Sequence, residues 1–199
     1  MRKVEFEYDY KSIDEIKKIY FLNELCYPVR TQVNNIAITI QSLFYYYPQL
    51  QKSNVDSLTS ILSKTINILS YSVIDGIVIL LGIKMQKKCE GCHNKDNCKY
   101  YSNSIFAGKS KDNELNAFVN AKKHLEKCKI INLSDHAKNV FKEYRDIRNY
   151  VHITRNGLIM TKDDNFTKEK SRDLLNFLQY FVKHLYNNYQ EFLKNNNCK

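Results

Sequence analysis

The near absence of helix-breaking residues constrains the fold of this chain more than any other feature. Its 199 residues include only two prolines and five glycines, which are the residues that most often interrupt helices. Apolar residues recur at intervals of three and four along most of the chain, as expected for helices with one buried face. The sequence therefore predicts an all-α fold, and its length suits one domain over residues 1–199.

The apolar periodicity predicts about five helices. Pro28 and Pro48 should bracket the first of them, and the most apolar of them should form the centre of the core. Ser134 or Asp135 is available as the N-cap of the fourth. The five are expected at residues 29–47, 55–85, 114–127, 134–154 and 168–194. Residues 1–27 mix strand-like alternation with a short helical pattern around residues 13–22, and residues 87–112 form an irregular, cysteine-containing insertion.

The sequence gives no indication of a membrane segment. Its first six residues lack the continuous apolar stretch of a secretory signal. The most apolar window, residues 66–83, contains Asn67, Ser70, Ser72 and Asp75, which would be costly in hydrocarbon. We therefore expect this window to be a buried core helix and the protein to be cytoplasmic.

The charge balance favours anionic partners. The formal net charge is +10, and long-range attraction of this sign makes nucleic acid the leading candidate. A chain rich in Lys, Asn, Ile and Tyr also resembles the product of an AT-rich genome, in which spare surface positions drift to Lys and Asn. The charge alone therefore leaves both explanations open.

Residues 144–152 place two arginines, an amide and a histidine within one expected helix. At about 100° per residue, Arg145 and His152 share nearly the same azimuth two turns apart, and Arg148 lies one turn before His152. A histidine can transfer a proton near neutral pH, and a guanidinium stays charged and holds a phosphate through two hydrogen bonds. Together they can cleave a phosphodiester without a metal, although such residues also meet by chance on solvated helices.

This segment resembles the signature of HEPN domains, small helical bundles that carry an Arg, usually followed by a polar residue, and then a His near a helix end, with four to six residues between the Arg and the His. Six residues separate Arg145 from His152, and Asp146 is the polar follower. Arg148 and Asn149 look like the usual Arg-Asn pair, but only three residues separate Arg148 from His152. Either arginine therefore remains a candidate for the family arginine. The resemblance implies a HEPN-like bundle that spans the chain.

The resemblance also implies a metal-independent endoribonuclease of the kind used by bacterial toxins and phage-defence systems. His152 would be the general base or acid, Arg145 and Arg148 would stabilise charge on the phosphate, and Asn149 would orient His152 or bind the phosphate. HEPN ribonucleases bring two motif helices into one cleft. We therefore expect a homodimer with residues 134–154 in its interface, RNA as substrate, no catalytic cofactor, and an antitoxin or defence-system partner.

Two other functions are compatible with the same residues. Many HEPN-like domains bind RNA, nucleotides or partner proteins without cleavage, and the irregular spacing from arginine to histidine fits that alternative. The chain could instead be a zinc-stabilised nucleic-acid-binding protein whose working surface is the basic insertion. Cleavage that depends on His152 would separate the first function from these two.

Asp75 is a secondary candidate for the active site. It interrupts the apolar run at residues 73–78, and a buried carboxylate needs a cationic or hydrogen-bonding partner. An arginine of residues 144–152 could be that partner. Some HEPN domains carry an extra helix carboxylate near their site, and this resemblance is what makes Asp75 a secondary candidate. A carboxylate at a wet edge of the bundle is an equally good interpretation.

Four cysteines and one histidine form a candidate metal site. A Cys-x2-Cys pair can place two thiolates on one tetrahedral ion, and later residues can complete the set. The candidate ligands are Cys89, Cys92, Cys98, His124 and Cys128. Structural zinc is the leading hypothesis, unligated thiols are the main alternative, and the cysteine spacing also resembles that of certain iron–sulfur nucleases.

Overall fold

Every regular element in the described part of the chain is a helix, as the sequence predicts. The computed structural model describes residues 11–90, 113–151 and 166–195, and at 89–90, 113–116 and 144–151 it describes the backbone alone. Within these ranges there is no strand. The helices are α1 (Ile13–Ile19), α2 (Leu22–Leu25), α3 (Arg30–Lys52), α4 (Asp56–Glu90), α5 (Asn113–Lys127), α6 (Asp135–Val151) and α7 (Lys168–Asn195).

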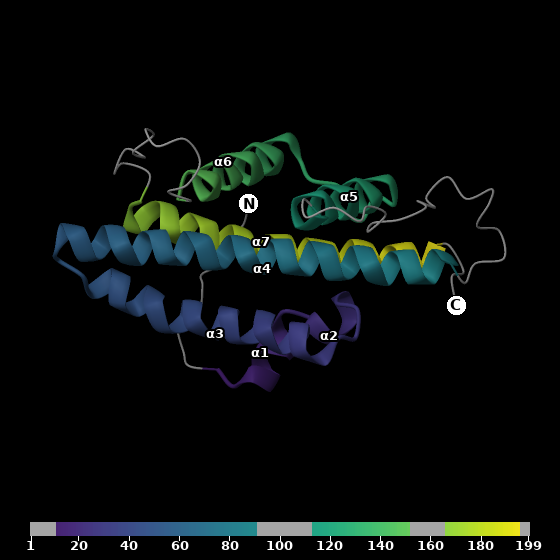
Figure 1. Ribbon diagram of the computed structural model, residues 1–199, viewed down its shortest axis with the longest axis horizontal. Coiled ribbons are helices and arrows are strands. Elements are labelled where there is room, and N and C mark those ends of the chain that lie inside the picture. The colour runs from purple at the N-terminus through teal and green to yellow at the C-terminus, as the bar shows by residue number, and fades with distance from the viewer. Residues whose placement is uncertain (1–10, 91–112, 152–165, 196–199) are drawn as a thin grey trace.

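Helices α4 and α7 run parallel along the length of the molecule (Figure 1). At one end, Lys168 Nζ donates hydrogen bonds to the carbonyl oxygens of Gln51 and Ser53, at 3.0 and 2.6 Å. At the other end, Lys84 Nζ lies 5.4 Å from the centre of the Tyr189 ring. Helix α3 lies along one side of α4, and α5 and α6 lie along the other.

Helix α4 is the predicted central core helix. Its side chains are fully buried over most of its circumference, among them Ile66, Val73, Ile77 and Leu81. By length and composition alone, residues 56–88 would be long and apolar enough to cross a membrane, but 61% of the apolar window is buried inside the protein. The apolar character of α4 is therefore explained in large part by helices packed around it.

The first short helices add to the five that were predicted. Ser12 caps α1, because its hydroxyl accepts from the Glu15 amide at 3.3 Å while the Glu15 carboxylate accepts from the Ser12 amide at 2.7 Å. Phe21 has a left-handed backbone conformation (φ 51°) that separates α1 from α2. Its ring stacks on Tyr186 of α7, with centroids 3.9 Å apart. Tertiary packing therefore fixes this break. The predicted strand-like residues 4–10 lie outside the described part.

The prediction that Pro48 ends its helix is wrong, because α3 continues to Lys52. Proline lacks an N–H and so cannot donate to the carbonyl one turn earlier. The last turn nevertheless buries Leu50 completely, and the Ser53 amide donates to the Gln49 carbonyl at 3.0 Å. Burial of this turn outweighs the one backbone hydrogen bond that proline removes.

Gly76 allows α3 to approach α4 closely. A Cβ atom at this position would lie 3.1 Å from Cδ1 of Ile36 and 3.2 Å from its Cγ1. Both atoms belong to a side chain that can shift slightly, so a methyl group needs only a small adjustment. A larger side chain would force the two helices apart.

We expect Gly76→Ala to change the free energy of unfolding little, because better helix propensity, about 1 kcal/mol, offsets the tighter contact with Ile36. Gly76→Leu should lower it by about 1–3 kcal/mol through overpacking. Urea denaturation of the two variants measures the difference. Equal stability of both variants would show that the α3–α4 contact is looser than the distance of 3.1 Å from Ile36 implies.

His184 helps to hold α7 against the turn that follows α5. The amide nitrogen of Asn188 lies 3.0 Å from His184 Nε2 and donates to the Ile130 carbonyl at 3.0 Å. Burial lowers the pKa of His184 below its usual 6.5, although a hydrogen bond to the backbone of Asn132 opposes this effect. The neutral ring can accept from Asn188, whereas the protonated ring cannot.

Because the pKa of His184 is lower in the folded state than in the unfolded state, its contribution to stability is present above about pH 6.5 and is lost as the pH falls through the folded-state pKa. We therefore expect the thermal unfolding midpoint to fall on acidification. His184→Gln, which keeps an acceptor, should reduce that fall. His136→Gln is the control, since His136 is exposed. If His184→Gln and His136→Gln behave alike, His184 is not the titrating group.

Candidate active site

Helix α6 carries the predicted arginines and asparagine. Ser134 is the predicted N-cap, and its hydroxyl accepts from the Ala137 amide at 3.3 Å. From there the helix continues to Val151 and includes Arg145, Arg148 and Asn149. The predicted His152 lies outside the described residues.

Phe141 fixes α6 in the bundle. The centre of its ring lies 5.6–6.3 Å from the ring centres of Phe118, Phe177 and Phe181, a range in which aromatic pairs attract. The hydroxyl of Tyr71 in α4 donates to the Phe141 carbonyl at 2.7 Å, and this bond is buried. These contacts join α6 to α4, α5 and α7 at a single point.

The second half of α6, which carries Arg145 and Arg148 and is called the motif half below, extends toward the end of the bundle where α4 and α7 begin. Lys170 Nζ, in the first turn of α7, lies 3.8 Å from the Glu143 carboxylate, so α6 is antiparallel to α7. Figure 1 shows the same direction. At 1.5 Å per residue, Arg145 and Arg148 lie roughly 6 and 10 Å beyond Phe141 along the helix.

A buried polar seam lies at about the same level of the bundle. It consists of Ser63, Asn67 and Ser70 of α4 and Ser171 of α7, all with 0% exposure. The Asn67 amide donates to the Ser63 carbonyl at 2.8 Å. The Asn67 Oδ1 atom and the three hydroxyl groups have no hydrogen-bond partner among the described residues. Buried groups of this kind are normally hydrogen-bonded, so the seam is suited to a polar partner.

The contact between Tyr71 of α4 and Phe141 of α6 shows how the buried polar seam and the α6 arginines are placed relative to each other along the bundle. Asn67 lies one turn and Ser63 two turns before Tyr71 in α4. Arg145 lies one turn and Arg148 two turns after Phe141 in α6. Because the two helices are antiparallel, helix geometry places Arg145 near the level of Asn67 and Arg148 near the level of Ser63. Asn67 and Ser70 interrupt an apolar stretch of the sequence, and their spacing with Ser63 puts all three on one face of α4.

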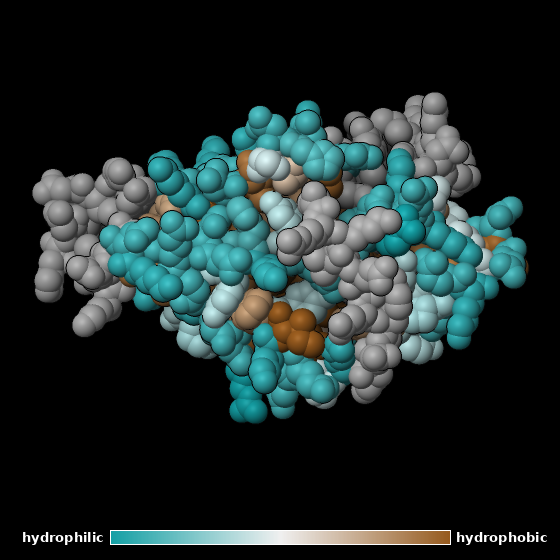
Figure 2. All heavy atoms as spheres, turned by 180° about the vertical axis from the view of Figure 1, so that it is seen from behind, coloured by the Kyte–Doolittle hydropathy of each residue, from teal (hydrophilic) through white to brown (hydrophobic). Residues whose placement is uncertain are grey.

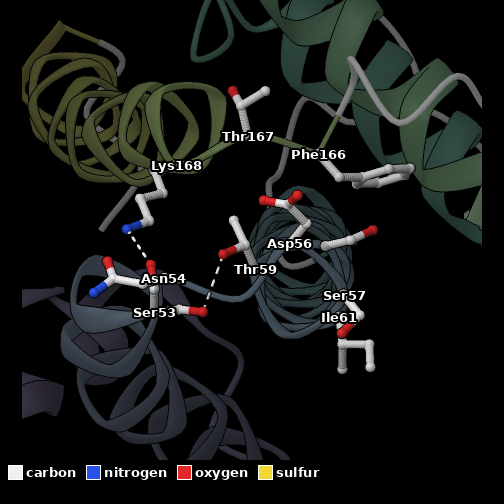
Figure 3. Close-up of a pocket in the computed structure, with 10 residues that line it drawn as sticks. Ser53, Asn54, Asp56, Ser57, Thr59, Ile61, Phe166, Thr167 and Lys168 are labelled. Carbon is white, nitrogen blue, oxygen red and sulfur yellow. Dashed lines mark hydrogen bonds between the residues drawn. The ribbon is translucent and has the colours of Figure 1, made fainter.

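An open cavity of about 810 Å³ lies at this end of the bundle. Figure 3 shows it between the first turns of α4 and α7. The lining residues are mostly hydroxylic or amidic: Ser53, Asn54, Asp56, Ser57, Thr59, Ser60, Ile61, Phe166, Thr167 and Lys168. The starts of two parallel helices carry partial positive charge, which favours anions nearby. Lys168 itself is engaged by the carbonyls of Gln51 and Ser53, so its main role here is structural.

Asp75 lies apart from the motif half of α6. It is half-buried in α4, one turn after Tyr71, whereas Arg145 and Arg148 lie at the level of residues before Tyr71. The contact between Tyr71 and Phe141 thus falls between the carboxylate and the arginines along the bundle. The described backbone therefore does not bring Asp75 to the level of either arginine.

Two of the predicted metal ligands lie close together. His124 and Cys128 are 2% and 3% exposed, and His124 Nε2 is 4.0 Å from Cys128 Sγ. A tetrahedral zinc ion would hold a nitrogen and a sulfur roughly 3.6 Å apart, so this pair fits one ion after a small shift. Cys89 lies near the end of α4, and Cys92 and Cys98 fall outside the described residues. Among the described residues no group of three or more potential ligands is found.

We predict about one zinc ion per chain, bound as a closed structural site, because ligation couples metal affinity to the folding of a polar segment. Cys128→Ser should lower the zinc content measured by native mass spectrometry. Cys26→Ser is the matched control, because Cys26 is an equally buried thiol that is not expected to bind zinc. Chelation should loosen residues 87–128 in hydrogen exchange. Zinc-free protein with a well-ordered 87–128 segment would contradict the prediction.

Comparison with known proteins identifies no relative of this chain. No family model matches it, and neither does any curated protein or solved structure.

Proposed function

We propose that this protein is a metal-independent endoribonuclease of the HEPN type, with its active site at the end of the bundle where α4 and α7 begin. One observation carries the proposal: helix α6 extends Arg145 and Arg148 toward this end, at the level of a buried polar seam and close to a polar cavity. The net charge of +10 supports an RNA substrate, because positive charge attracts the phosphate backbone.

In the proposed reaction, the 2′-hydroxyl of one nucleotide attacks the adjacent phosphorus atom and the bond to the leaving 5′-oxygen breaks. His152 takes the proton from the 2′-hydroxyl or delivers one to the 5′-oxygen, and solvent supplies the other proton transfer. The products are a 2′,3′-cyclic phosphate and a free 5′-hydroxyl. Arg145 and Arg148 stabilise the extra negative charge on the phosphate oxygens, and Asn149 orients His152 or binds the phosphate.

The buried seam supports a positioning role for α4. A guanidinium group has five N–H donors and no acceptor. The Asn67 Oδ1 atom and the Ser63 hydroxyl are acceptors at the levels of Arg145 and Arg148. Hydrogen bonds to them would fix an arginine and leave its remaining N–H groups for the phosphate. A fixed arginine loses little entropy when it binds the transition state.

A homodimer belongs to this proposal, because HEPN ribonucleases combine two motif helices in one cleft. An antitoxin or defence-system protein would then regulate the site by covering it. A HEPN-like module that binds RNA, nucleotides or proteins without cleaving is the alternative function, and a zinc-stabilised nucleic-acid-binding protein is another. Neither alternative requires an intact histidine at position 152.

We expect the purified protein to cleave total RNA in the presence of EDTA. His152→Ala should lower the rate by about 10²–10⁴-fold, the usual contribution of general acid–base catalysis. His136→Ala is the matched control, since this exposed histidine near the start of α6 has no proposed role. Arg145→Ala and Arg148→Ala should both slow cleavage, and the larger loss identifies the family arginine.

Circular dichroism of each variant shows whether its fold is intact. RNA that is bound but not cut by the unaltered protein would favour the binding module. Cleavage that stops in EDTA would point to a metal-dependent site instead.

A further inference from the structure

Lys64 is the only charged side chain between Asp56 and Asp75 of α4. Hydrophilic residues dominate the side of the molecule seen in Figure 2, where an exposed lysine would need no explanation. Lys64 is instead half-buried, and its Nζ atom lies 5.0 Å from the centre of the Phe166 ring. Phe166 lines the cavity drawn in Figure 3. A half-buried ammonium group therefore lies at the end of the bundle where the ribonuclease site is proposed.

Lys64 has no counter-charge among the described side chains. No described carboxylate forms an ion pair with its Nζ atom, and no described group accepts a hydrogen bond from it. The contact with the Phe166 ring attracts the charge but uses none of the three N–H donors for a conventional hydrogen bond. Since a partly buried charge is costly unless it is paired, Lys64 is suited to binding an anion.

Lys64 lies on the face of α4 that contacts α6. It precedes Tyr71 by seven residues, a spacing that falls about 20° short of two full helical turns. The hydroxyl of Tyr71 donates to the Phe141 carbonyl of α6 at 2.7 Å, so this face of α4 is directed at α6. Position 64 is therefore directed at α6 as well, about 10 Å from Tyr71 along the helix.

The two arginines repeat this spacing on α6. Arg145 follows Phe141 by four residues and Arg148 follows it by seven, which places the two positions about 40° and 20° around the helix from Phe141. Phe141 is buried, so its face of α6 is directed into the bundle. Because α6 is antiparallel to α4, position 148 lies opposite Lys64, two turns beyond the contact between Tyr71 and Phe141.

Helix α6 stays close to the bundle beyond Phe141, because Glu143 lies 3.8 Å from Lys170 of α7. Positions 64, 145 and 148 thus bring three positive charges to one level. Like charges at short range repel each other unless an anion lies between them. We propose, on the basis of the ribonuclease function above, that Lys64 binds the phosphate group that is cleaved. Its ammonium group donates to a phosphate oxygen from the side of α4, opposite the arginines, and stabilises the negative charge of the transition state.

The rate of RNA cleavage in EDTA tests this role. Lys64→Met removes the charge and keeps a long side chain, and we expect kcat/KM to fall about 10²–10³-fold, as when one donor to a developing negative charge is removed. Lys64→Arg, which keeps the charge, should recover most of the loss. Cleavage by Lys64→Met at the unaltered rate would refute the role of Lys64 and leave the proposed ribonuclease intact.

Lys84→Met is the matched control. Lys84 is also half-buried in α4, and its Nζ atom lies 5.4 Å from the centre of the Tyr189 ring. The two lysines are about 30 Å apart along the helix. Lys84→Met therefore removes the same charge and the same kind of ring contact far from the site, and it should keep the rate of the unaltered protein.

RNA binding tests the phosphate contact without cleavage. In the His152→Ala protein, each phosphate contact to single-stranded RNA contributes about 0.7 to the slope of log affinity against log salt concentration. Adding Lys64→Met should reduce the slope by this amount, whereas adding Lys84→Met should leave it nearly unchanged. Equal slopes for the two would mean that Lys64 acts only through net charge and would overturn the proposal. If the unaltered protein cleaves no RNA, the ribonuclease is refuted, while a smaller slope for Lys64→Met alone would still support a phosphate site at Lys64.

Thermal unfolding in a buffer without phosphate separates this role from a structural one. Added inorganic phosphate should raise the unfolding midpoint of the unaltered protein more than that of Lys64→Met, because a ligand stabilises the state that binds it. A midpoint that falls for Lys64→Met, with cleavage and salt slope unchanged, would mean that Lys64 only supports Phe166. Circular dichroism shows that each variant is folded at the assay temperature.

Discussion

The burial of α4 by its neighbours is the constraint on which the rest of this structure depends. Side chains such as Ile66, Val73 and Ile77 lose all contact with water because α3, α7 and the α5–α6 pair each cover a different part of the helix. Each fully buried aliphatic side chain contributes about 1.5–3 kcal/mol. Phe141 fastens α6 to the same core, so the position of the motif half of α6 follows from the packing of α4.

The sequence predicts the positions of the helices better than it predicts which residues of different helices contact each other. Periodicity located the five long helices and the Ser134 cap, because each depends on local spacing. It missed the extension of α3 past Pro48 and the break at Phe21, where burial of Leu50 and stacking on Tyr186 override local preference. Tertiary packing also decides the direction of α6. No pattern within one helix reveals which residues of another helix lie at its level.

The same contrast holds for the candidate site, where spacing within one segment could be predicted and the alignment of different helices could not. His124 is in the last turn of α5 and Cys128 directly follows the helix, so their proximity could be expected from their spacing of four residues. The level of Asp75 relative to Arg145 depends on how α4 and α6 are aligned, which only the bond from Tyr71 to Phe141 reveals. The buried seam was visible as a pattern, since residues 63, 67 and 70 share a helix face. Its place beside Ser171 of α7 and at the level of the α6 arginines depends on how the helices pack, which the sequence does not show.

The parallel course of α4 and α7 has a consequence for how this chain can vary. Two adjacent parallel helices cannot be joined by a tight turn, so the chain must travel back along the bundle before α7 can begin. The residues between Glu90 and Lys168 make that return, and they include nearly every candidate for chemistry in this protein. The central helices and most of the candidate chemical groups are thus carried by different stretches of sequence. A related chain could exchange the whole return path for another, acquire a new activity, and keep the same central helices.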